Sequence, residues 1–308
     1  MTPGKTDAVS VIIPTYNGAR RIMRVLEALR AQTTPGFEVV VVIDGSTDDT
    51  AERVEEARSW FERIRVIRQE NAGRAAVRNR GAAEASEDLL VFLDDDMHPA
   101  PGCVDAHVAH HTLHPGSLVS GTQYEVDGPE ETSFTRFRAR LRRQWDAPLR
   151  QIHGPLPFER LHMTAANFSI ERAVFERLGG FDPRLNDGED LVLLHQAHRA
   201  GVPIFYSESA YATHHDEATC RGFVNRLRQY HAAREKVLEL HPELGDVVHL
   251  PMRDQGLGRK VFYALASRPS MVHWIDRGGG GWLPTSVYDR MCASVVWGLG
   301  HVHRDREV

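Results

Sequence analysis

Three consecutive aspartates stand at the end of an apolar run, in the stretch Leu89–Pro101 with the sequence LLVFLDDDMHPAP. Adjacent carboxylates repel one another, so an ordinary solvated turn would need only one of Asp94, Asp95 and Asp96. Carboxylate oxygens are the ligands that Mg²⁺ and Mn²⁺ prefer, usually together with phosphate oxygens and water. The triplet therefore predicts a site for a divalent metal (Mg or Mn), with a solvated acidic turn as the alternative.

A second pair of acids, Glu189 and Asp190, lies in the segment DGEDLVLL. A carboxylate beside a hydroxyl group can act as a general base and take the proton as the oxygen attacks. The same letters also suit a helix start, with Asp187 as N-cap and Asp190 in the first turn, where the helix dipole favours acids. The pattern by itself leaves both interpretations open.

An Asp-x-Asp group after a strand also occurs in phosphatases that form an aspartyl phosphate. Those enzymes usually place the pair after the first strand, with Thr or Val following it. Here the aspartates follow the fourth apolar run, and Met97 and His98 come next. The sequence therefore disfavours a phosphatase.

The elements that must position these acids begin with four short apolar runs rich in Val and Ile. The runs are continuous rather than alternating, which is typical of parallel strands buried on both faces of a sheet. Helical patterns separate them, and the order predicts an α/β fold with a mostly parallel sheet flanked by helices. The four runs are Val9–Pro14, Phe37–Asp44, Ile64–Gln69 and Leu89–Asp94.

The helical patterns between the runs have signatures of their own. In the first, apolar residues fall at i, i+3, i+4 and i+7 and form one stripe. The second opens with Ser46 and Asp49 at the spacing of a capping box. The third, GRAAVRNRGAAEAS, is rich in alanine. The stripe of the first helix consists of Ile22, Val25, Leu26 and Leu29.

Unusual polar segments follow all four apolar runs: PTYNG, DGSTDD, QENAG and DDDM. In sheets of this class, ligands bind beyond the carboxyl ends of the strands. A purely structural role predicts polar turns at both ends of the strands and gives no reason for acids to gather at one edge. The sequence therefore predicts a ligand site at this edge of the sheet.

The rest of the chain is less regular. A basic stretch, Thr135–Trp145, carries five arginines and suits a solvated face, an anionic acceptor or a membrane surface. Helical spacing extends over Thr219–His241, and we expect the last sixty or so residues to form a helical appendage. The predicted organisation is a catalytic domain over residues 1–216 and a helical C-terminal extension over 217–308.

The composition narrows the class of protein. The chain has 308 residues and a net charge of 37 − 42 = −5, which argues against a dedicated nucleic-acid binder. Three widely spaced cysteines form no zinc or disulfide pattern and suit a reducing compartment. No signal segment and no run of about 18 apolar residues is present. We expect a cytoplasmic protein whose membrane contact is peripheral at most.

Seven segments, taken in order, resemble the inverting family 2 glycosyltransferases, which have the GT-A fold. They cover about residues 9–215, and together they are far more specific than any one of them. Many relatives have two acids before the GST, whereas this chain has Ile43 and Asp44. The segments are VSVIIPTYNG, VVVVIDGSTDDT, NAGRAAVRNRGAA, LLVFLDDDM, NFSIERAVFERLGGFDP, GEDLVLLHQAHRAG and ATHH.

The resemblance implies transfer of a sugar from a nucleotide sugar, most often a UDP-sugar, with a divalent metal and inversion at the anomeric carbon. It implies that Asp190 is the general base, with Glu189 beside it binding the acceptor or supporting the base. It also implies metal contacts for Asp96 and for a histidine, for which we favour His214 over His215.

Nucleotide contacts follow from the same resemblance. Asp44 is expected to accept a hydrogen bond from the uracil imide, and Asp94 and Asp95 to lie towards the ribose. Of the two arginines after Gly73, one is expected to reach the nucleotide and the other to be a surface charge. The predicted nucleotide-binding residues are Pro14, Thr15, Tyr16, Asn17, Asp44, Gly73, Arg74, Arg78, Asp94 and Asp95.

The acceptor cannot be read from the residues, and small molecules, lipid-linked sugars, polysaccharides and peptides all remain open. Two other functions are also open: a nucleotidyltransferase of related fold, and a non-catalytic nucleotide-sugar binding protein. The GED segment favours sugar transfer over nucleotidyl transfer, which needs a phosphate acceptor site. The intact acids at Asp44, Asp94–Asp96 and Asp190 disfavour a binding protein without catalysis.

Overall fold

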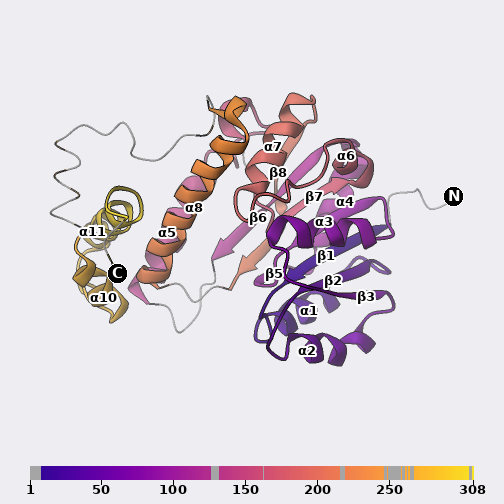
Figure 1. Ribbon diagram of the computed structural model, residues 1–308, viewed down its shortest axis with the longest axis horizontal. Coiled ribbons are helices and arrows are strands. Elements are labelled where there is room, and N and C mark those ends of the chain that lie inside the picture. The colour runs from indigo at the N-terminus through magenta and orange to yellow at the C-terminus, as the bar shows by residue number, and fades with distance from the viewer. Residues whose placement is uncertain are drawn as a thin grey trace. The chain divides into compact units, whose positions relative to one another are not determined.

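A computed structural model gives the architecture of the chain (Figure 1). It describes residues 8–125, 132–161, 163–215, 219–245, 248, 258, 261, 263, 267–304 and 307–308. The chain divides into two compact units, Met1–Tyr124 with Asp146–His215, and Glu125–Trp145 with Asp216–Val308. The sequence did not predict that residues 125–145 group with the C-terminal part. The predicted boundary between residues 216 and 217 lies outside the described residues, and that division stays a prediction.

The first unit is built on one sheet, which has eight strands in the described residues, in the order β3-β2-β1-β4-β7-β6-β8-β5. The first four of these are parallel, as the continuous apolar runs predicted, and β7 joins β4 in the antiparallel direction. The predicted α/β class is confirmed. The strands are β1 Val9–Thr15, β2 Glu38–Asp44, β3 Ile64–Gln69, β4 Leu89–Leu93, β5 Met97–Pro99, β6 Leu118–Glu125, β7 Asn167–Glu171 and β8 Ile204–His214.

Helices cover both faces of the sheet (Figure 1). In the first unit they are α1 Ile22–Arg30, α2 Thr50–Glu56, α3 Arg74–Glu84, α4 Cys103–Leu113, α6 Arg172–Arg177 and α7 Glu189–Arg199, with short 3₁₀ turns at Arg58–Trp60 and Phe158–Arg160. Strand residues alternate between two cores, so that Ile12 and Val40 face α3 while Val11 and Val39 face α1. The predicted stripe of α1 is fully buried, as expected.

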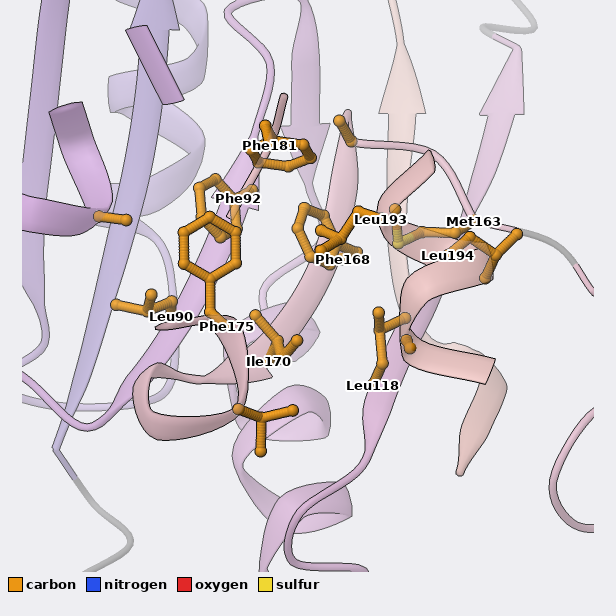
Figure 2. Close-up of a cluster of buried hydrophobic side chains, with 14 of the residues drawn as sticks. Leu90, Phe92, Leu118, Met163, Phe168, Ile170, Phe175, Phe181, Leu193 and Leu194 are labelled. Atoms are coloured by element: carbon orange, nitrogen blue, oxygen red, sulfur yellow. The ribbon is translucent and has the colours of Figure 1, made fainter. Parts of the chain in front are cut away.

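Aromatic rings fill the core beneath α6 and α7 (Figure 2). Phe92 of β4 stacks on Phe168 of β7 with ring centroids 4.7 Å apart, and Phe181 meets Phe92 edge-to-face at 5.6 Å. Aromatic pairs in these two geometries are favourable beyond the area they bury. The packing fixes β4 against β7, and thereby the strand end from which the three aspartates project.

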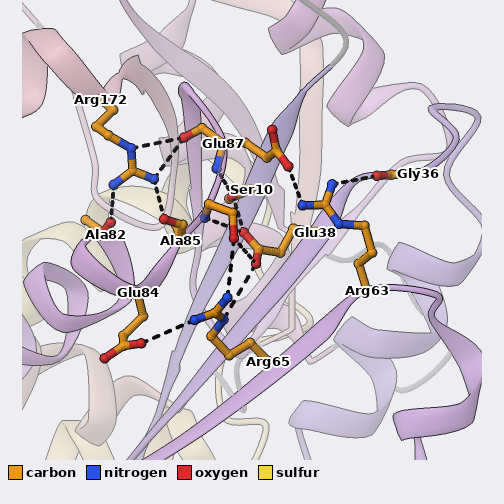
Figure 3. A network of polar contacts seen from close by, with 11 residues as sticks. Ser10, Gly36, Glu38, Arg63, Arg65, Ala82, Glu84, Ala85, Glu87 and Arg172 are labelled. Atoms are coloured by element: carbon orange, nitrogen blue, oxygen red, sulfur yellow. Dashed lines mark hydrogen bonds and ion pairs between the residues drawn. The ribbon is translucent and has the colours of Figure 1, made fainter.

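A polar network closes the opposite edge of the sheet (Figure 3). The carboxylate of Glu38, at the start of β2, accepts hydrogen bonds from Ser10 Oγ at 2.6 Å and from the Ser86 backbone N–H at 2.7 Å. Arg172 donates to the carbonyl oxygens of Ala82, Ala85 and Glu87. These contacts satisfy backbone groups at the end of α3 and fix the loop that leads into β4.

One predicted cap is wrong. Helix α2 begins at Thr50, with Asp49 as N-cap, and the Asp49 side chain makes no capping hydrogen bond. Ser46 Oγ instead accepts from the backbone N–H of Asn17 at 3.0 Å, and Asp48 bonds Thr50. The hydroxyl that the capping box requires is therefore taken by the loop after β1.

The second unit consists of helices around a core of its own (Figure 1). The predicted helix at 219–241 is confirmed as α8, and Thr219 Oγ1 caps it by accepting from the Gly222 N–H. No described helix in either unit is long and apolar enough to cross a membrane. The described helices are α5 Ser133–Asp146, which continues one residue into the first unit, α8 Cys220–Leu240, a 3₁₀ turn Pro242–Leu244, α10 Pro269–Asp276, α11 Thr285–Trp297 and a π-helical turn Gly298–Val302.

Candidate active site

The three aspartates occupy the turn between β4 and β5. The turn is held on both sides, because β4 is paired with β1 and β7, while β5 is paired with β8 in a register that sets Met97 opposite His214. The Asp94 N–H donates to the carbonyl of Ala166 at 3.1 Å. The same register brings His214 beside Asp96, from more than one hundred residues further along the chain.

Asp96 and His214 form the pair that was predicted to hold the metal. His214 Nε2 lies 3.5 Å from Asp96 Oδ2. Burial raises the pKa of Asp96, but the hydrogen bond and charge of His214 outweigh it and hold that pKa below its usual range. Asp96 Oδ1 is buried and has no hydrogen-bond partner in the described part of the chain. His215 turns elsewhere and stacks on His98 at 3.6 Å.

These residues fit a hard divalent ion. A buried carboxylate oxygen that accepts no hydrogen bond can bind such an ion, and the imidazole beside it can serve as a second ligand. Within the described ranges, no cluster of three or more His, Cys, Asp or Glu side chains is arranged to hold a metal. Phosphate oxygens and water would therefore supply the remaining ligands.

Asp95 is engaged by its neighbours in the protein. Its Oδ2 accepts from Thr15 Oγ1 at 2.6 Å, and Arg21 donates to both carboxylate oxygens at 3.0 and 3.2 Å. Burial raises the pKa of Asp95 to about 6, against the opposing effects of Arg21 and Thr15. Gly18 is required here, because a Cβ at this position would lie 2.2 Å from Thr15 Oγ1. Arg21 was not predicted for the site, and only its place shortly after PTYNG hinted at it.

Asp44 is the last residue of β2, and its carboxylate bonds β3 and the loop after it. Its Oδ1 accepts from Gln69 Nε2 at 2.7 Å and from the Ala72 N–H at 2.9 Å, and its Oδ2 accepts from the Gly73 N–H at 3.0 Å. A carboxylate can accept about four hydrogen bonds, so Oδ2 keeps room for one more donor. Gly73 takes a φ of 88°, which favours glycine, and is the N-cap of α3.

The loop after β1 is tied to the loop after β2. Asn17 has a φ of 46°, and its Oδ1 accepts from the Thr47 N–H at 2.8 Å. Tyr16, beside Asn17, has half of its surface exposed. Asparagine tolerates this left-handed conformation better than most residues, which gives the N of PTYNG a structural reason.

A cavity of about 580 Å³ opens at this edge of the sheet. All ten residues predicted to bind the nucleotide line it, together with Asp96; Glu189, Asp190 and His214 do not. The volume lies in the range of small-molecule and cofactor sites. Four lining residues were not predicted: Arg21, Asn71, Val77 and Asn186.

Arg78 connects the two groups of acids. Its guanidinium is fully buried and donates to Asp94 Oδ1 through Nη2 and to Glu189 Oε1 at 2.7 Å through Nη1. Both carboxylates raise the pKa of Arg78 above its usual value, against the effect of burial. Arg74 is half-exposed and lies 3.7 Å from Asp187. Both arginines line the cavity, and which of them reaches the nucleotide stays a prediction.

The acids of α7 stand at the start of a helix whose N-cap is Gly188, with a φ of 81° and no side-chain cap. The interpretation of Asp187 and Asp190 as a capping pair is therefore wrong. Asp190 Oδ1 accepts from the Leu191 N–H at 2.8 Å. Burial raises the pKa of Asp190 against the effect of Arg78, and burial likewise raises that of Glu189 to about 7.

Relatives of known name are similar to this chain in sequence. It is 36% identical over 240 residues to validoxylamine A glucosyltransferase of Streptomyces hygroscopicus subsp. jinggangensis (strain 5008), a match that covers 68% of this chain and 56% of that protein. The protein of the same name from subsp. limoneus is also 36% identical over 240 residues, and the match covers 52% of that protein. The chain thus spans about half the length of the curated relatives it matches.

Solved structures share its fold. The mannosyltransferase PcManGT of Pyrobaculum calidifontis, in complex with GDP-Man and Mn²⁺, has a TM-score of 0.63 at 20% identity, covering 97% of this chain and 88% of that one. TarS 1–349 of S. aureus, in complex with UDP-GlcNAc, has a TM-score of 0.53 at 18% identity, covering 97% and 92%. At such identities these neighbours show the fold alone, which is GT-A.

The model of the family described as "Glycosyl transferase family 2" matches residues 10–179 of this chain. These residues include nearly all of β1 to β4, the aspartate triplet and most of the cavity lining. That match spans more than half of the chain, and the chain belongs to glycosyl transferase family 2.

Proposed function

We propose that this protein is an inverting glycosyltransferase that takes its sugar from a UDP-sugar, uses Mg²⁺ or Mn²⁺, and employs Asp190 as general base. One observation carries the proposal: Arg78 joins the aspartate triplet, which lines a nucleotide-sized cavity, to the acids at the start of α7. The donor cavity and the acids at the start of α7 thereby share one buried cation, which also interacts electrostatically with Asp190, so donor and base can be held close together.

The donor is proposed to lie in the cavity with its base against Asp44. The carboxylate has one acceptor position left on Oδ2, which suits the single imide N–H of uracil. Asp94 and Asp95 would lie towards the ribose, although Thr15 and Arg21 already occupy both oxygens of Asp95. Any contact of Asp95 with the nucleotide would therefore have to share these donors.

Asp96 and His214 are the residues that would hold the metal. When bound, a divalent ion neutralises the negative charge that develops on a diphosphate leaving group. Arg21 and Arg74 line the same cavity and add positive charge for the same anion. Of the solved neighbours, PcManGT is described in complex with Mn²⁺.

The proposed base is Asp190. Its carboxylate accepts from the Leu191 N–H at 2.8 Å and from the Ala165 backbone, and these two bonds orient it. Burial raises the pKa of Asp190, and a carboxylate with a raised pKa is a stronger base. As the acceptor oxygen bonds to the anomeric carbon, the bond to the diphosphate breaks, the proton passes to Asp190, and the configuration inverts.

A panel of UDP- and GDP-sugars, incubated with Mg²⁺, Mn²⁺ or EDTA, tests the proposal by the release of nucleoside diphosphate. We expect slow hydrolysis of one UDP-sugar that requires the metal, with the inverted anomer as the first product seen by NMR. Donor binding without turnover, with and without an acceptor mixture, would instead identify a binding protein. Pyrophosphate release from UTP and a sugar phosphate would identify a nucleotidyltransferase.

A further inference from the structure

We propose that the tip formed by α10, α11 and the loop between them, residues Arg268–Arg290, docks on the surface of an anionic lipid bilayer. The sequence pointed to Thr135–Trp145 as the basic surface of this unit. In the structure, Arg138 of that stretch pairs with Glu125, and Arg140 pairs with Asp289. Two of its five arginines are therefore compensated within the unit, and the proposal rests on the tip.

The tip exposes large apolar side chains. Trp282 is 81% exposed, the highest value among the large hydrophobic residues that the structure describes as exposed. Val287, in the first turn of α11, and Trp274, on α10, are also exposed. A tryptophan has an apolar body and a polar N–H, and it is the residue type enriched where a protein meets the boundary between lipid and water.

The loop that carries Trp282 has a defined conformation. A Cβ on Gly279 would lie 2.3 Å from Trp274 Cδ2, so only glycine lets the backbone rest on the indole ring. Gly278 and Gly280 take φ values of 82° and 79°. The Gly279 N–H donates to the Trp274 carbonyl at 2.8 Å, and the Leu283 N–H donates to that of Gly280 at 2.9 Å. Trp282 is thus presented by a folded loop, so little ordering is needed when it binds.

The charges of the tip are unbalanced. Arg268, Arg277 and Arg290 are exposed, and none has a side-chain hydrogen bond or ion pair with any residue the structure describes. The two acids of the tip are engaged elsewhere. Asp276 accepts from the backbone N–H groups of Cys220 and Arg221, and Asp289 accepts from Arg140. The tip therefore presents three exposed arginines whose charges no described side chain compensates, together with an exposed tryptophan.

An anionic bilayer fits both properties at once. Arginines near such a surface gain energy from the negative potential of the headgroups, and the indole enters the interface. A neutral polysaccharide would use the tryptophan but would leave the arginines unmatched. The site already described in the first unit contributes nothing to this inference, which holds whatever sugar that site transfers.

Co-sedimentation of the full chain with large unilamellar vesicles tests the proposal. We compare vesicles of phosphatidylcholine with vesicles that contain roughly 30–40% phosphatidylglycerol, which is enough to give a strongly negative surface. We expect binding only to the anionic vesicles, weakening as NaCl rises from about 50 to 500 mM. Removal of two charges in Arg277→Gln with Arg290→Gln should weaken binding by about twenty-five-fold, at about five-fold for each charge. Trp282→Ser should weaken it by about ten-fold.

Matched variants in the first unit serve as controls. Leu113 is 75% exposed, so Leu113→Ser removes a comparable apolar side chain, and Arg177→Gln with Arg199→Gln removes two exposed charges. Circular dichroism shows that each variant is folded. Controls that bind as the unaltered chain does, beside weakened tip variants, support the proposal. No binding to anionic vesicles at low salt, or equal binding by tip variants and controls, overturns it, as does tip-dependent binding to dextran but not to vesicles.

Discussion

Arg78 Nη1 donates to Glu189 Oε1 at 2.7 Å, across 111 positions of sequence and with both side chains at least 95% buried. The same guanidinium donates to Asp94. One cation is therefore shared by two carboxylates that stand on different elements, the end of β4 and the start of α7. The charge of Arg78 is balanced only while Asp94 and Glu189 are both present.

Replacement of Arg78 by methionine should destabilise the fold by about 3–5 kcal/mol, because it leaves the Glu189 carboxylate buried without its partner. A double-mutant cycle with Glu189→Gln measures the coupling between the two residues. The losses in free energy of unfolding of the two single variants should add up to at least about 1 kcal/mol more than the loss of the double variant. Urea unfolding of the four proteins measures this. Arg74→Met, on the exposed side of the same helix, should change the free energy of unfolding by about 1 kcal/mol at most. Additive losses would show that the two groups are not coupled.

Asp190→Asn should lower kcat for sugar transfer by about 10²–10⁴-fold, since an amide cannot take the proton of the acceptor. KM for the donor should change little, because Asp190 does not line the donor cavity. Steady-state kinetics separate the two constants, and the thermal midpoint verifies folding. Asp187→Asn removes a neighbouring acid that has no part in the proposed chemistry, and it should stay near the unaltered rate. Turnover close to normal in folded Asp190→Asn would exclude the base role.

Asp96→Asn should weaken the binding of Mn²⁺ in the presence of UDP by about ten-fold or more, since a carboxylate ligand becomes an amide. Titration calorimetry with Mn²⁺ and UDP measures it, and His214→Ala should shift the affinity in the same direction. His98→Ala, which removes a nearby ring that does not contact Asp96, is the matched control. If the control weakens binding as much as His214→Ala does, then His214 is no metal ligand.

Acid should destabilise the protein through His107 of α4. Its two ring nitrogens bond Ser169 Oγ at 2.8 Å and Asn167 Oδ1 at 3.1 Å, and burial lowers its pKa to about 4. The unfolded chain, with a histidine pKa of about 6.5, binds the proton more readily, so stability falls as the pH drops from about 6.5 towards 4. The loss attributable to His107 should be about 2 kcal/mol at pH 5 relative to pH 8.

Urea unfolding at several pH values checks this expectation. His107→Gln should lose stability at pH 8 but show a smaller decrease between pH 8 and pH 5. His153→Gln, at an exposed position, should keep the full decrease. An unchanged decrease in His107→Gln would assign the acid sensitivity to other groups. One of these is His111, which bonds the same Ser169 hydroxyl and whose pKa burial also lowers.

Much of the site could be predicted because the chemistry follows the strand ends. Continuous apolar runs located β1 to β4 to within a residue or so, and parallel strands place their carboxyl ends at one edge. Asp44 and Asp94 therefore had to approach each other, and the cavity contains both. The preference for His214 over His215 agrees with its position 3.5 Å from Asp96, while its ligand role stays a prediction.

The remaining features depend on contacts between distant parts of the chain. Nothing local marks Arg21 as the partner of Asp95, 74 positions away, or Asn186 as the acceptor for the Arg74 N–H. The predicted cap of α2 was wrong, and so was the alternative interpretation of Asp187 and Asp190 as a capping pair, for the same reason. Spacing alone could not reveal that Ser46 bonds the loop after β1, or that Gly188 precedes α7 in a left-handed conformation.

The pairing of β4 and β5 on either side of Asp94–Asp96 has an evolutionary consequence. Since the sheet holds the turn, the three negative charges are forced together in every folded molecule, whether or not a cation is present. A substitution that neutralises Asp95, whose ionised form is disfavoured by burial and by the charge of Asp96, can therefore make the apoprotein more heat-resistant at a cost to the proposed activity. Selection for thermal stability alone would erode this triplet early, and its persistence in a stabilised descendant would be a record of selection on activity.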